Sequence, residues 1–335
     1  MIKQALNKII QRVDLEQNEM EEVMQEIMKG EATPAQIAAF LTALRMKGES
    51  IEEITAAAKI MRQYAVRIET KSDVLDTCGT GGDSKGTFNI STISAIVSAS
   101  AGAAVAKHGN RSVSSKCGSA DVLKALGVNI EISKEKVEQC LQQIGIAFLF
   151  APLLHPAMKN VLGPRREIGI RTIFNILGPL TNPATAKFQL LGVYDKKLCS
   201  LLASVLKNLG SQHCLIVHSG DGMDEVSTAA KTFVSELING EIKNYEIDPA
   251  DFGFPLARIE DLQGGDAERN AEIGLDILKG KKFPPRDIVL LNSGCAIYAA
   301  NKADDIKTGI EMAKEAIDAG KALKKLEELK EFTNS

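Results

Sequence analysis

The sequence predicts an α/β fold class, in which a small all-helical domain precedes a large α/β domain with a mainly parallel central sheet. Two observations lead to this prediction. Residues 3–68 show helical periodicity alone, and from Val74 onward short apolar runs alternate with helical stretches. A chain of 335 residues is long enough to build both units around extensive apolar cores.

The first 68 residues are expected to form several short helices. Apolar side chains recur there at helical spacing in three groups: Leu6, Ile9 and Ile10; Met20, Val23, Met24, Ile27 and Met28; Ile37, Phe40, Leu41 and Leu44. Thr33 followed by Pro34 is typical of an N-cap with proline at the first helical position. Ser50 followed by Glu53 fits a capping box at the start of the next helix.

Short apolar runs beyond residue 70 are expected to form the strands. They lie at residues 74–75, 103–106, 128–132, 189–194, 214–218 and 288–291. Because helical stretches separate these runs, their strands should be mainly parallel. An Asn-Gly turn at residues 239–240 predicts one antiparallel hairpin over residues 237–242. The charged, amphipathic segment 313–332 is expected to form a helix on the surface.

The composition is that of an ordinary globular protein. Hydrophobic residues make up 44% and charged residues 25%, and the formal net charge of −3 leaves no basic footprint for nucleic acid. The six cysteines form no CxxC pair, so we expect buried, reduced thiols and no zinc site. No run approaches the roughly 18 apolar residues of a membrane span, and the N-terminal segment lacks the features of a secretion signal. We therefore expect a cytoplasmic protein without nucleic-acid or membrane partners.

A glycine-rich segment follows the first predicted strand. Residues 76–83 read DTCGTGGD, and NIST follows at residues 89–92, a segment that offers side-chain donors and an N-cap for a helix over residues 93–101. Glycines let the backbone approach a ligand, and successive N–H groups beside a helix N-terminus bind anions, so the segment predicts a phosphate site. A dinucleotide fingerprint would need glycine at Ser84, and a P-loop would need lysine after Gly86. The alternative is a tight turn selected for backbone shape alone.

A polar segment follows the second predicted strand. Residues 107–115 read KHGNRSVSS and place two cations, a histidine, an asparagine and three serines at the end of that strand. Lysine and arginine neutralise phosphate oxygens, and serine hydroxyls donate hydrogen bonds to them, so this segment predicts a second part of the phosphate site. A solvated polar loop is the alternative, and His108 can equally pack beside a ligand or orient it.

An acidic segment follows the run at residues 214–218. Three carboxylates, those of Asp221, Asp224 and Glu225, fall within five residues. Magnesium ions prefer a few carboxylate oxygens together with waters and substrate phosphates. Adjacent Asp224 and Glu225 are therefore candidate ligands for a magnesium ion that bridges to a diphosphate. An acidic turn exposed to water is the alternative.

Residues 163–183 combine three arginines with three glycines and end in a Gly-Pro-Leu-Thr-Asn-Pro turn, a composition typical of a hinge. An arginine that projects from such a connection can form a bidentate pair with the carboxylate of a second substrate. The three candidates are Arg165, Arg166 and Arg171. For each of them, pairing with Glu167 or capping a helix is the alternative.

Taken in order, these segments give the whole chain a close resemblance to the anthranilate phosphoribosyltransferase family, which belongs to the nucleoside phosphorylase-like class of phosphoribosyltransferases. The motifs are DTCGTGGD, NIST, KHGNRSVSS, GIRTIFNILGPLTNP and DGMDE. The resemblance implies transfer of the phosphoribosyl group of 5-phosphoribosyl 1-pyrophosphate (PRPP) to the amine of anthranilate. The products would be N-(5-phosphoribosyl)anthranilate and pyrophosphate, in tryptophan biosynthesis, with Mg²⁺ as cofactor.

The resemblance also implies the residues of the site. For PRPP they are Gly79, Gly82, Asp83, Thr87, Asn89, Ile90, Ser91, Thr92, Lys107, Gly109, Asn110, Arg111, Ser112, Val113, Ser114, Ser115 and Ser119. For anthranilate they are Gly79, His108, Asn110, Arg165 and Gly178, and for the metal Ser91, Asp224 and Glu225. No general acid or base is assigned, because the lone pair of an aromatic amine is already free at neutral pH.

The family fold implies a small helical domain of residues 1–70 and 164–188, hinged to a large α/β domain of residues 71–163 and 189–335. It implies a homodimer joined through the helical domains, and it does not decide whether an anthranilate synthase glutaminase is a partner. Two other interpretations remain open: a pyrimidine nucleoside phosphorylase and a silent relative that binds nucleic acid. The acidic pair together with Arg165 and Asn110 disfavours the first, and the near-neutral charge disfavours the second.

Overall fold

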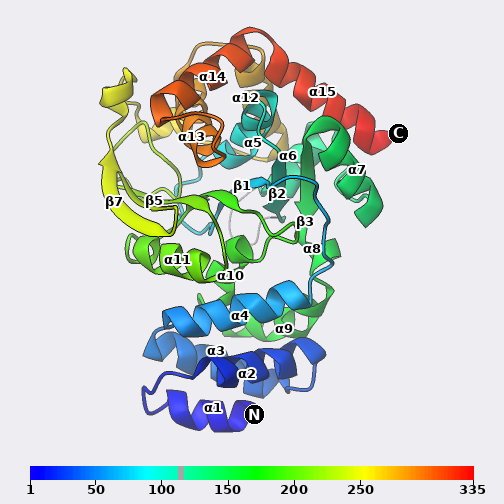
Figure 1. Cartoon of the computed structure of the whole chain (residues 1–335), viewed down its shortest axis with the longest axis vertical. Helices are drawn as coiled ribbons and strands as arrows, with labels where there is room; N and C mark the ends of the chain where they lie inside the picture. Colours follow the sequence, from blue (N-terminus) through cyan, green and yellow to red (C-terminus); the bar gives the residue numbers. More distant parts are fainter. Residues whose placement is uncertain (112–116) are drawn as a thin grey trace.

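The computed structural model describes residues 1–111 and 117–335. Helices from the N-terminal part of the chain form one end of the molecule, a sheet lies across the middle, and further helices cover the far side of the sheet (Figure 1). The predicted fold class, a helical domain followed by an α/β domain with a mainly parallel sheet, is confirmed.

Four helices from the first 65 residues build the helical end: α1 (Ile2–Ile9), α2 (Gln17–Lys29), α3 (Pro34–Lys47) and α4 (Ile51–Gln63). Local sequence sets where two of them begin. The hydroxyls of Thr33 and Ser50 each accept a hydrogen bond from the backbone N–H three residues later, and the side chains of Gln36 and Glu53 accept one in return. Both predicted N-termini are therefore confirmed, and each is a capping box.

Seven strands form one sheet in the order β3-β2-β1-β4-β5-β6-β7. The strands are β1 (Leu75–Gly79), β2 (Val105–Gly109), β3 (Ile146–Phe150), β4 (Phe188–Gly192), β5 (His213–Ser219), β6 (Thr232–Ile238) and β7 (Glu241–Ile247). The first five in spatial order are parallel, and the predicted hairpin at Asn239-Gly240 adds β6 and β7 antiparallel. Because parallel strands end at one edge, the loops after β1, β2, β4 and β5 lie together.

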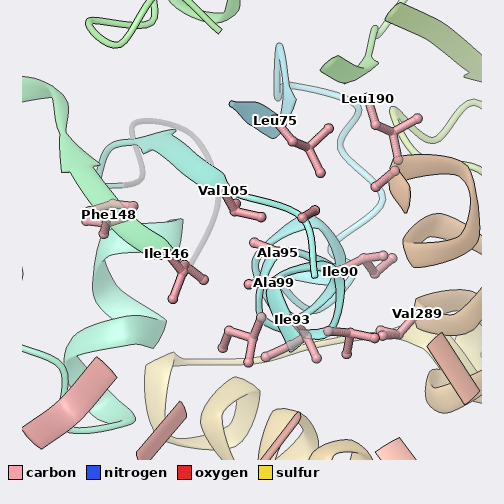
Figure 2. Packing of buried hydrophobic residues seen from close by; sticks show 14 of the residues in the cluster. Leu75, Ile90, Ile93, Ala95, Ala99, Val105, Ile146, Phe148, Leu190 and Val289 are labelled. Atoms are coloured by element: carbon pink, nitrogen blue, oxygen red, sulfur yellow. The ribbon is translucent and has the colours of Figure 1, made fainter. Parts of the chain in front are cut away.

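Helices cover both faces of the sheet. Helices α10 (Phe174–Leu180) and α11 (Lys197–Asn208) lie between the sheet and the helical end, whereas α5 (Ile90–Ser100) and α13 (Pro284–Ala299) cover the other face (Figure 1). Figure 2 shows α5 packed among side chains of the sheet, including Leu75, Val105, Ile146 and Leu190, and of α13, including Val289. This packing fixes the start of α5 beneath the carboxyl ends of β1 and β2.

The remaining helices are shorter or lie outside these layers. They are α6 (Ser119–Ala125), α7 (Lys134–Ile144), α8 (Ala151–Leu154), α9 (Lys159–Ile168), α12 (Ala267–Leu278), α14 (Ile306–Asp318) and α15 (Lys321–Asn334), with 3₁₀ turns at Pro156–Met158, Pro249–Phe252 and Ile259–Leu262. Helix α9 contacts α2 and α3, and α10 contacts α4. These contacts support placing residues 164–188 with the helical end, although α9 already begins at Lys159. The division into two domains remains a prediction.

Three secondary-structure predictions were wrong. Residues 288–291 lie inside α13, because a helix buried on every side shows no periodicity. Residues 128–132 alternate between buried and more exposed side chains, but the segment pairs with no described strand. The predicted helix over residues 313–332 is two helices, since Gly320 takes a left-handed φ of 72° between α14 and α15. Strand β3 was also missed.

No helix in the described part of the chain has the length and apolar character needed to cross a membrane. All six cysteines are buried, as their scattered positions predicted.

Candidate active site

The acidic segment after β5 is a rigid turn that presents Asp224 and Glu225. The carboxylate of Asp221 accepts hydrogen bonds from the hydroxyls of Ser219 and Ser227, at 2.6 Å for Ser227, and from the backbone N–H of Met223 at 3.0 Å. Asp221 is thus engaged in holding the turn. Asp224 and Glu225 do not take part in these contacts and face the carboxyl ends of the strands.

Two glycines make room for Asp224 where β1 and β4 end. Gly79 and Gly192 are paired residues in the parallel register of these strands. A methyl group at Gly79 would lie 2.4 Å from the Asp224 carboxylate, and one at Gly192 would lie 1.5 Å from its backbone oxygen. The N–H of Gly81 donates to the same carboxylate at 2.7 Å. The glycine-rich segment therefore seats the acidic turn directly against the sheet edge.

Burial and mutual repulsion set the charge of this acidic cluster. Burial first, and then the nearby Asp83 carboxylate, raise the pKa of Asp224 to about 7. Burial and the Asp224 charge raise the pKa of Glu225 well above its ordinary value, and the Lys107 ammonium opposes that rise. Oδ2 of Asp83 is buried without a hydrogen-bond partner among the described residues. The Lys107 ammonium does not offset the raised pKa values of both carboxylates, so a bound cation would add the positive charge that favours their ionised forms.

The donor set fits a hard divalent cation that shares its coordination with a substrate. The residues that the structure describes contain no group of three His, Cys, Asp and Glu side chains able to hold a metal by themselves. Two adjacent carboxylates with raised pKa values and a nearby Asp83 oxygen without a donor remain. Magnesium is typically held by one or two carboxylates together with waters and phosphate oxygens, so these residues suit it.

Lys107, expected just after the second strand, lies buried in the middle of β2, near the acidic pair. Its ammonium donates to the backbone oxygen of Thr77 and, at 3.4 Å, to the hydroxyl of Ser91. The N–H of Ser91 donates to the Glu225 carboxylate at 3.2 Å. Burial lowers the pKa of Lys107, and the carboxylates of Asp76 and Glu225 oppose the shift. The strand ends, the start of α5 and the acidic turn thus meet around one cation.

Asn89 stands at the N-cap position of α5, which begins three residues before the predicted Ile93, and its side chain does not cap the helix. The helix begins at Ile90, and no side-chain cap hydrogen bond is formed. Instead the Asn89 amide donates to the backbone oxygen of Cys117 at 3.3 Å and accepts from the Asn270 amide at 2.9 Å. Because Asn270 belongs to distant α12, sequence spacing gave no sign of it.

The segment before α12 holds the loop between Asp83 and Asn89 in place through backbone contacts. Thr87 forms an isolated antiparallel bridge with Gln263, and the N–H of Gly264 donates to the oxygen of Gly86 at 2.9 Å. Two residues predicted to bind PRPP are less accessible: Ile90 and Thr92 have exposed fractions of 0% and 1%. Their assignments, like the other site assignments, remain predictions.

Asn110 and Arg111 begin the polar segment after β2. Both are exposed, and the Arg111 guanidinium pairs with Glu131 at 3.2 Å and lies 5.8 Å from the centre of the Phe150 ring. Ser119 donates to the Asn110 oxygen at 3.3 Å, and its hydroxyl packs so closely on Gly109 that a methyl group there would lie 2.3 Å away. The predicted PRPP residues Ser112, Val113, Ser114 and Ser115 lie outside the described residues.

A pair of neutral histidines lies next to the residues predicted to bind anthranilate. The rings of His108 and His155 have centroids 5.0 Å apart, and the Nε2 atom of each ring is buried without a hydrogen-bond partner among the described residues. Burial is the largest cause that lowers the pKa of His108 to about 3 and that of His155 to about 4. His155 was not singled out in the sequence, where it stands among apolar residues.

Arg165 projects from α9 without an anionic partner. Its guanidinium lies 5.4 Å from the centre of the Phe174 ring and forms no ion pair with any described residue, Glu167 included. Burial lowers its pKa. A half-buried guanidinium of this kind is available for a carboxylate, which supports the predicted role over the alternatives.

Two further residues that position the site were missed in the sequence. Asp76, fully buried in β1, accepts hydrogen bonds from the Asn182 amide at 2.8 Å and from the His108 N–H at 3.1 Å. Asn292, in the helix that was mistaken for a strand, clamps the N–H and the oxygen of Val226 at 3.0 and 2.7 Å. Val226 directly follows Asp224 and Glu225, so Asn292 holds in place the backbone that carries these two carboxylates.

Comparisons with known proteins agree with this geometry. Residues 71–323 match the model of the glycosyl transferase family, a/b domain, and residues 3–65 match its helical bundle domain. A curated anthranilate phosphoribosyltransferase from Acetivibrio thermocellus is 54% identical over 100% of this chain and 97% of its own length. One from Alkaliphilus metalliredigens is 56% identical over 98% of this chain and 97% of its own.

Solved structures extend the agreement to three dimensions. The anthranilate phosphoribosyltransferase from Thermus thermophilus matches with a TM-score of 0.94 and 42% identity, covering 99% of each chain. The Saccharomyces cerevisiae enzyme, solved in complex with PRPP and Mg, matches with a TM-score of 0.92 and 28% identity, covering 99% of this chain and 98% of its own. The chain therefore belongs to the anthranilate phosphoribosyltransferase family.

Proposed function

We propose that the protein transfers the phosphoribosyl group of PRPP to the amine of anthranilate and releases pyrophosphate, within tryptophan biosynthesis. The observation that carries this proposal is one shared edge of the sheet, where the glycine-rich segment, buried Lys107 and the Asp224-Glu225 pair meet. Full-length relatives with this activity support it.

The sugar diphosphate would lie over the glycine-rich segment and the start of α5. Lys107 would neutralise phosphate oxygens, and the segment from Gly79 to Asp83 would bring its backbone close to them. Ser91 links Lys107 to the acidic pair, because its hydroxyl accepts a hydrogen bond from Lys107 and its N–H donates one to Glu225. These contacts support the assignment of Gly79, Gly82, Asp83, Ser91 and Lys107 to this substrate.

Ser91, Asp224 and Glu225 would hold a magnesium ion. When bound, such an ion neutralises the charge that develops on diphosphate oxygens as the bond to ribose breaks. The chain's own contribution is to keep both carboxylates in place, through Gly81 for Asp224 and through the Ser91 N–H for Glu225. The yeast relative solved with PRPP and Mg supports this use of the metal.

Anthranilate would enter beside the α9–α10 connection. Arg165, which has no anionic partner among the described residues, would pair with its carboxylate, while Asn110 and Gly178 would flank the ring. His108 would remain neutral, because its pKa is lowered to about 3, and would therefore add no charge beside the aromatic amine. A relative has been solved in complex with 4-fluoroanthranilate, which fits this substrate class.

The chemistry then follows from orientation and charge. The amine lone pair is free at neutral pH, so no residue has to remove a proton before attack. Nitrogen bonds to ribose C1 as the bond from C1 to the diphosphate oxygen breaks, and the diphosphate leaves with the bonding electrons. Lys107 stabilises that negative charge in a buried setting, where electrostatic interactions are strong. Holding the two substrates face to face supplies further acceleration.

The family resemblance further suggests a cytoplasmic homodimer joined through the helical ends. Size-exclusion chromatography with light scattering tests that assembly. A monomeric mass across the working concentration range would contradict it.

One assay separates the proposed function from its alternatives. The purified protein is incubated with anthranilate, PRPP and Mg²⁺, and loss of anthranilate fluorescence and release of pyrophosphate are measured together. A parallel reaction with a pyrimidine nucleoside and inorganic phosphate is the control. Equal loss of anthranilate and gain of pyrophosphate is expected, whereas turnover in the control alone would identify a nucleoside phosphorylase, and turnover in neither would overturn the proposal.

A further inference from the structure

Arg171, in the connection between α9 and α10, reaches across to the glycine-rich segment. Its guanidinium donates a hydrogen bond to the backbone oxygen of Gly82 and lies 4.2 Å from the centre of the Tyr194 ring. A methyl group at Gly82 would lie 3.3 Å from the same guanidinium nitrogen. The contact is therefore close, and it joins segments that are 89 residues apart in the chain.

Tyr194 connects Arg171 to the glycine-rich segment by a second route. Its backbone N–H donates to the Thr80 hydroxyl at 3.1 Å, and the Thr80 N–H donates to the Gly192 oxygen at 2.9 Å. Arg171 thus meets the glycine-rich segment twice, directly at Gly82 and through Tyr194 at Thr80. We call the group of Thr80, Gly82, Arg171 and Tyr194 the arginine clasp.

The arginine clasp also lies within electrostatic range of the helical end. The guanidinium groups of Arg45 and Arg171 both lower the pKa of the Tyr194 phenol, which burial raises overall. Arg45 lies near the end of α3 and forms an ion pair of 3.8 Å with Glu49. Tyr194 therefore sits where the helical end, the α9–α10 connection and the sheet edge meet.

We propose that Arg171 is a positioning residue that couples the two substrate sites, by fixing the glycine-rich segment to the connection that carries the anthranilate contacts. Arg165 precedes it on α9 and Gly178 follows it on α10, so movement of this connection is transmitted to Gly82. The catalytic part of this inference rests on the proposed function. Its structural part, the fixing of residues 80–86, does not.

The chemistry of the clasp requires arginine and an aromatic ring. A planar guanidinium can stack on tyrosine while it donates in its own plane to a carbonyl, whereas a lysine ammonium is a point charge and does not do both in that geometry. A cation stacked on an aromatic ring stabilises a contact even at an exposed site, and a hydrogen bond from a charged group stabilises it more strongly. Loss of both contacts therefore predicts weakening of PRPP binding by roughly tenfold or more.

The test uses Arg171→Lys, Tyr194→Leu and Tyr194→Phe, with Arg166→Lys as the matched control. Arg166 is an exposed arginine five residues earlier, in the last turn of α9, and its side chain forms no hydrogen bond or ion pair with a described residue. Hydrogen exchange of peptides covering residues 80–86 is measured in the protein without substrates, and exchange of β3 serves as the internal reference for overall stability. Steady-state kinetics then give kcat and the KM for each substrate.

Arg171→Lys and Tyr194→Leu are each expected to speed exchange of residues 80–86 several-fold while β3 is unchanged. Both should raise the KM for PRPP about tenfold with a smaller change in kcat, and Tyr194→Phe, which keeps the ring, should match the unaltered protein. Unchanged exchange in Arg171→Lys, or equal effects of Arg166→Lys, would overturn the inference. Inactivity of the unaltered protein would refute the proposed function alone, because the exchange data would still decide whether the clasp exists.

Discussion

Asn292 provides the sharpest test of how the acidic pair is held in place. Its side chain is fully buried in α13 and makes three hydrogen bonds, to the N–H and the oxygen of Val226 at 3.0 and 2.7 Å and to the oxygen of Ile288 at 2.8 Å. Asn292→Ala leaves both backbone groups of buried Val226 without a partner. Each costs about 1–3 kcal/mol, so the free energy of unfolding should fall by roughly 2–6 kcal/mol.

In the Asn292→Ala protein that remains folded, the same substitution should weaken the binding of Mg²⁺. Val226 directly follows Glu225, so a loosened backbone there displaces the carboxylates that would bind Mg²⁺. Loss of a group that orients metal ligands typically costs at least about tenfold in metal affinity, and the Mg²⁺ concentration for half-maximal activity should rise accordingly. Urea denaturation measures the free energy of unfolding, and a magnesium titration of the initial rate measures the metal requirement.

Ser293→Ala is the matched control. Ser293 is the next residue in the same helix and is also fully buried, but its hydroxyl has no hydrogen-bond partner among the described residues. Removing it should change the free energy of unfolding by less than about 1 kcal/mol and leave the magnesium titration unchanged. An Asn292→Ala protein as stable as the unaltered one, or a control that loses as much, would refute the reasoning.

Three further outcomes are expected. Alanine at both Asp224 and Glu225 should remove most magnesium-dependent turnover, measured as pyrophosphate release, and full activity would contradict the metal assignment. Arg165→Ala should raise the KM for anthranilate by about tenfold or more and that for PRPP far less, whereas equal rises would indicate a structural role. Finally, the pKa values of His108 and His155, about 3 and 4 when folded, lie below that of unfolded histidine. At each of these two histidines the unfolded chain binds more protons below about pH 6.5, so their contribution to the free energy of unfolding should fall as pH drops from 6.5 toward 4, by on the order of 1 kcal/mol per pH unit for each histidine. The raised pKa values of Asp224 and Glu225 contribute with the opposite sign, so the test compares two proteins. Urea denaturation of the unaltered protein and of His155→Gln at pH 7, 6 and 5 should give slopes that differ by on the order of 1 kcal/mol per pH unit, and equal slopes would contradict the role of His155.

The sequence predicted those parts of the fold that depend on neighbouring residues. The capping boxes at Thr33 and Ser50 and the hairpin turn at Asn239-Gly240 involve residues a few positions apart, so their signals are local. The errors arose where burial removes periodicity. The run at residues 288–291 lies in a helix enclosed on all sides, and β3 is buried along its whole length, so neither shows the alternation that distinguishes strand from helix.

Residues 128–132 illustrate a different limit. Their alternation between inner and outer side chains is real, but the N–H of Asn129 donates to the hydroxyl of Thr333 in the C-terminal helix rather than to a neighbouring strand. Strand pairing depends on what lies alongside in space. A single segment does not encode it.

The candidate site shows the same difference between local signals and contacts that form only in space. Residues predicted from motifs, such as Lys107, Ser91 and Glu225, lie together around the sheet edge. The residues that hold them in place come from distant helices: Asn270 is 181 residues from Asn89, and Asn292 is 66 residues from Val226. Such partners are single amides without a motif, and packing alone reveals them.

The glycines at the ends of β1 and β4 limit how this scaffold can be redesigned. Since even one methyl group at Gly79 or Gly192 would overlap Asp224, neither position can accept a side chain unless the acidic turn is rebuilt. Mutant libraries aimed at new amine acceptors should therefore keep both glycines and Arg171, and diversify exposed positions of the α9–α10 connection such as Ile170. In a saturation scan, Gly79 and Gly192 should be intolerant positions within an otherwise adaptable enzyme.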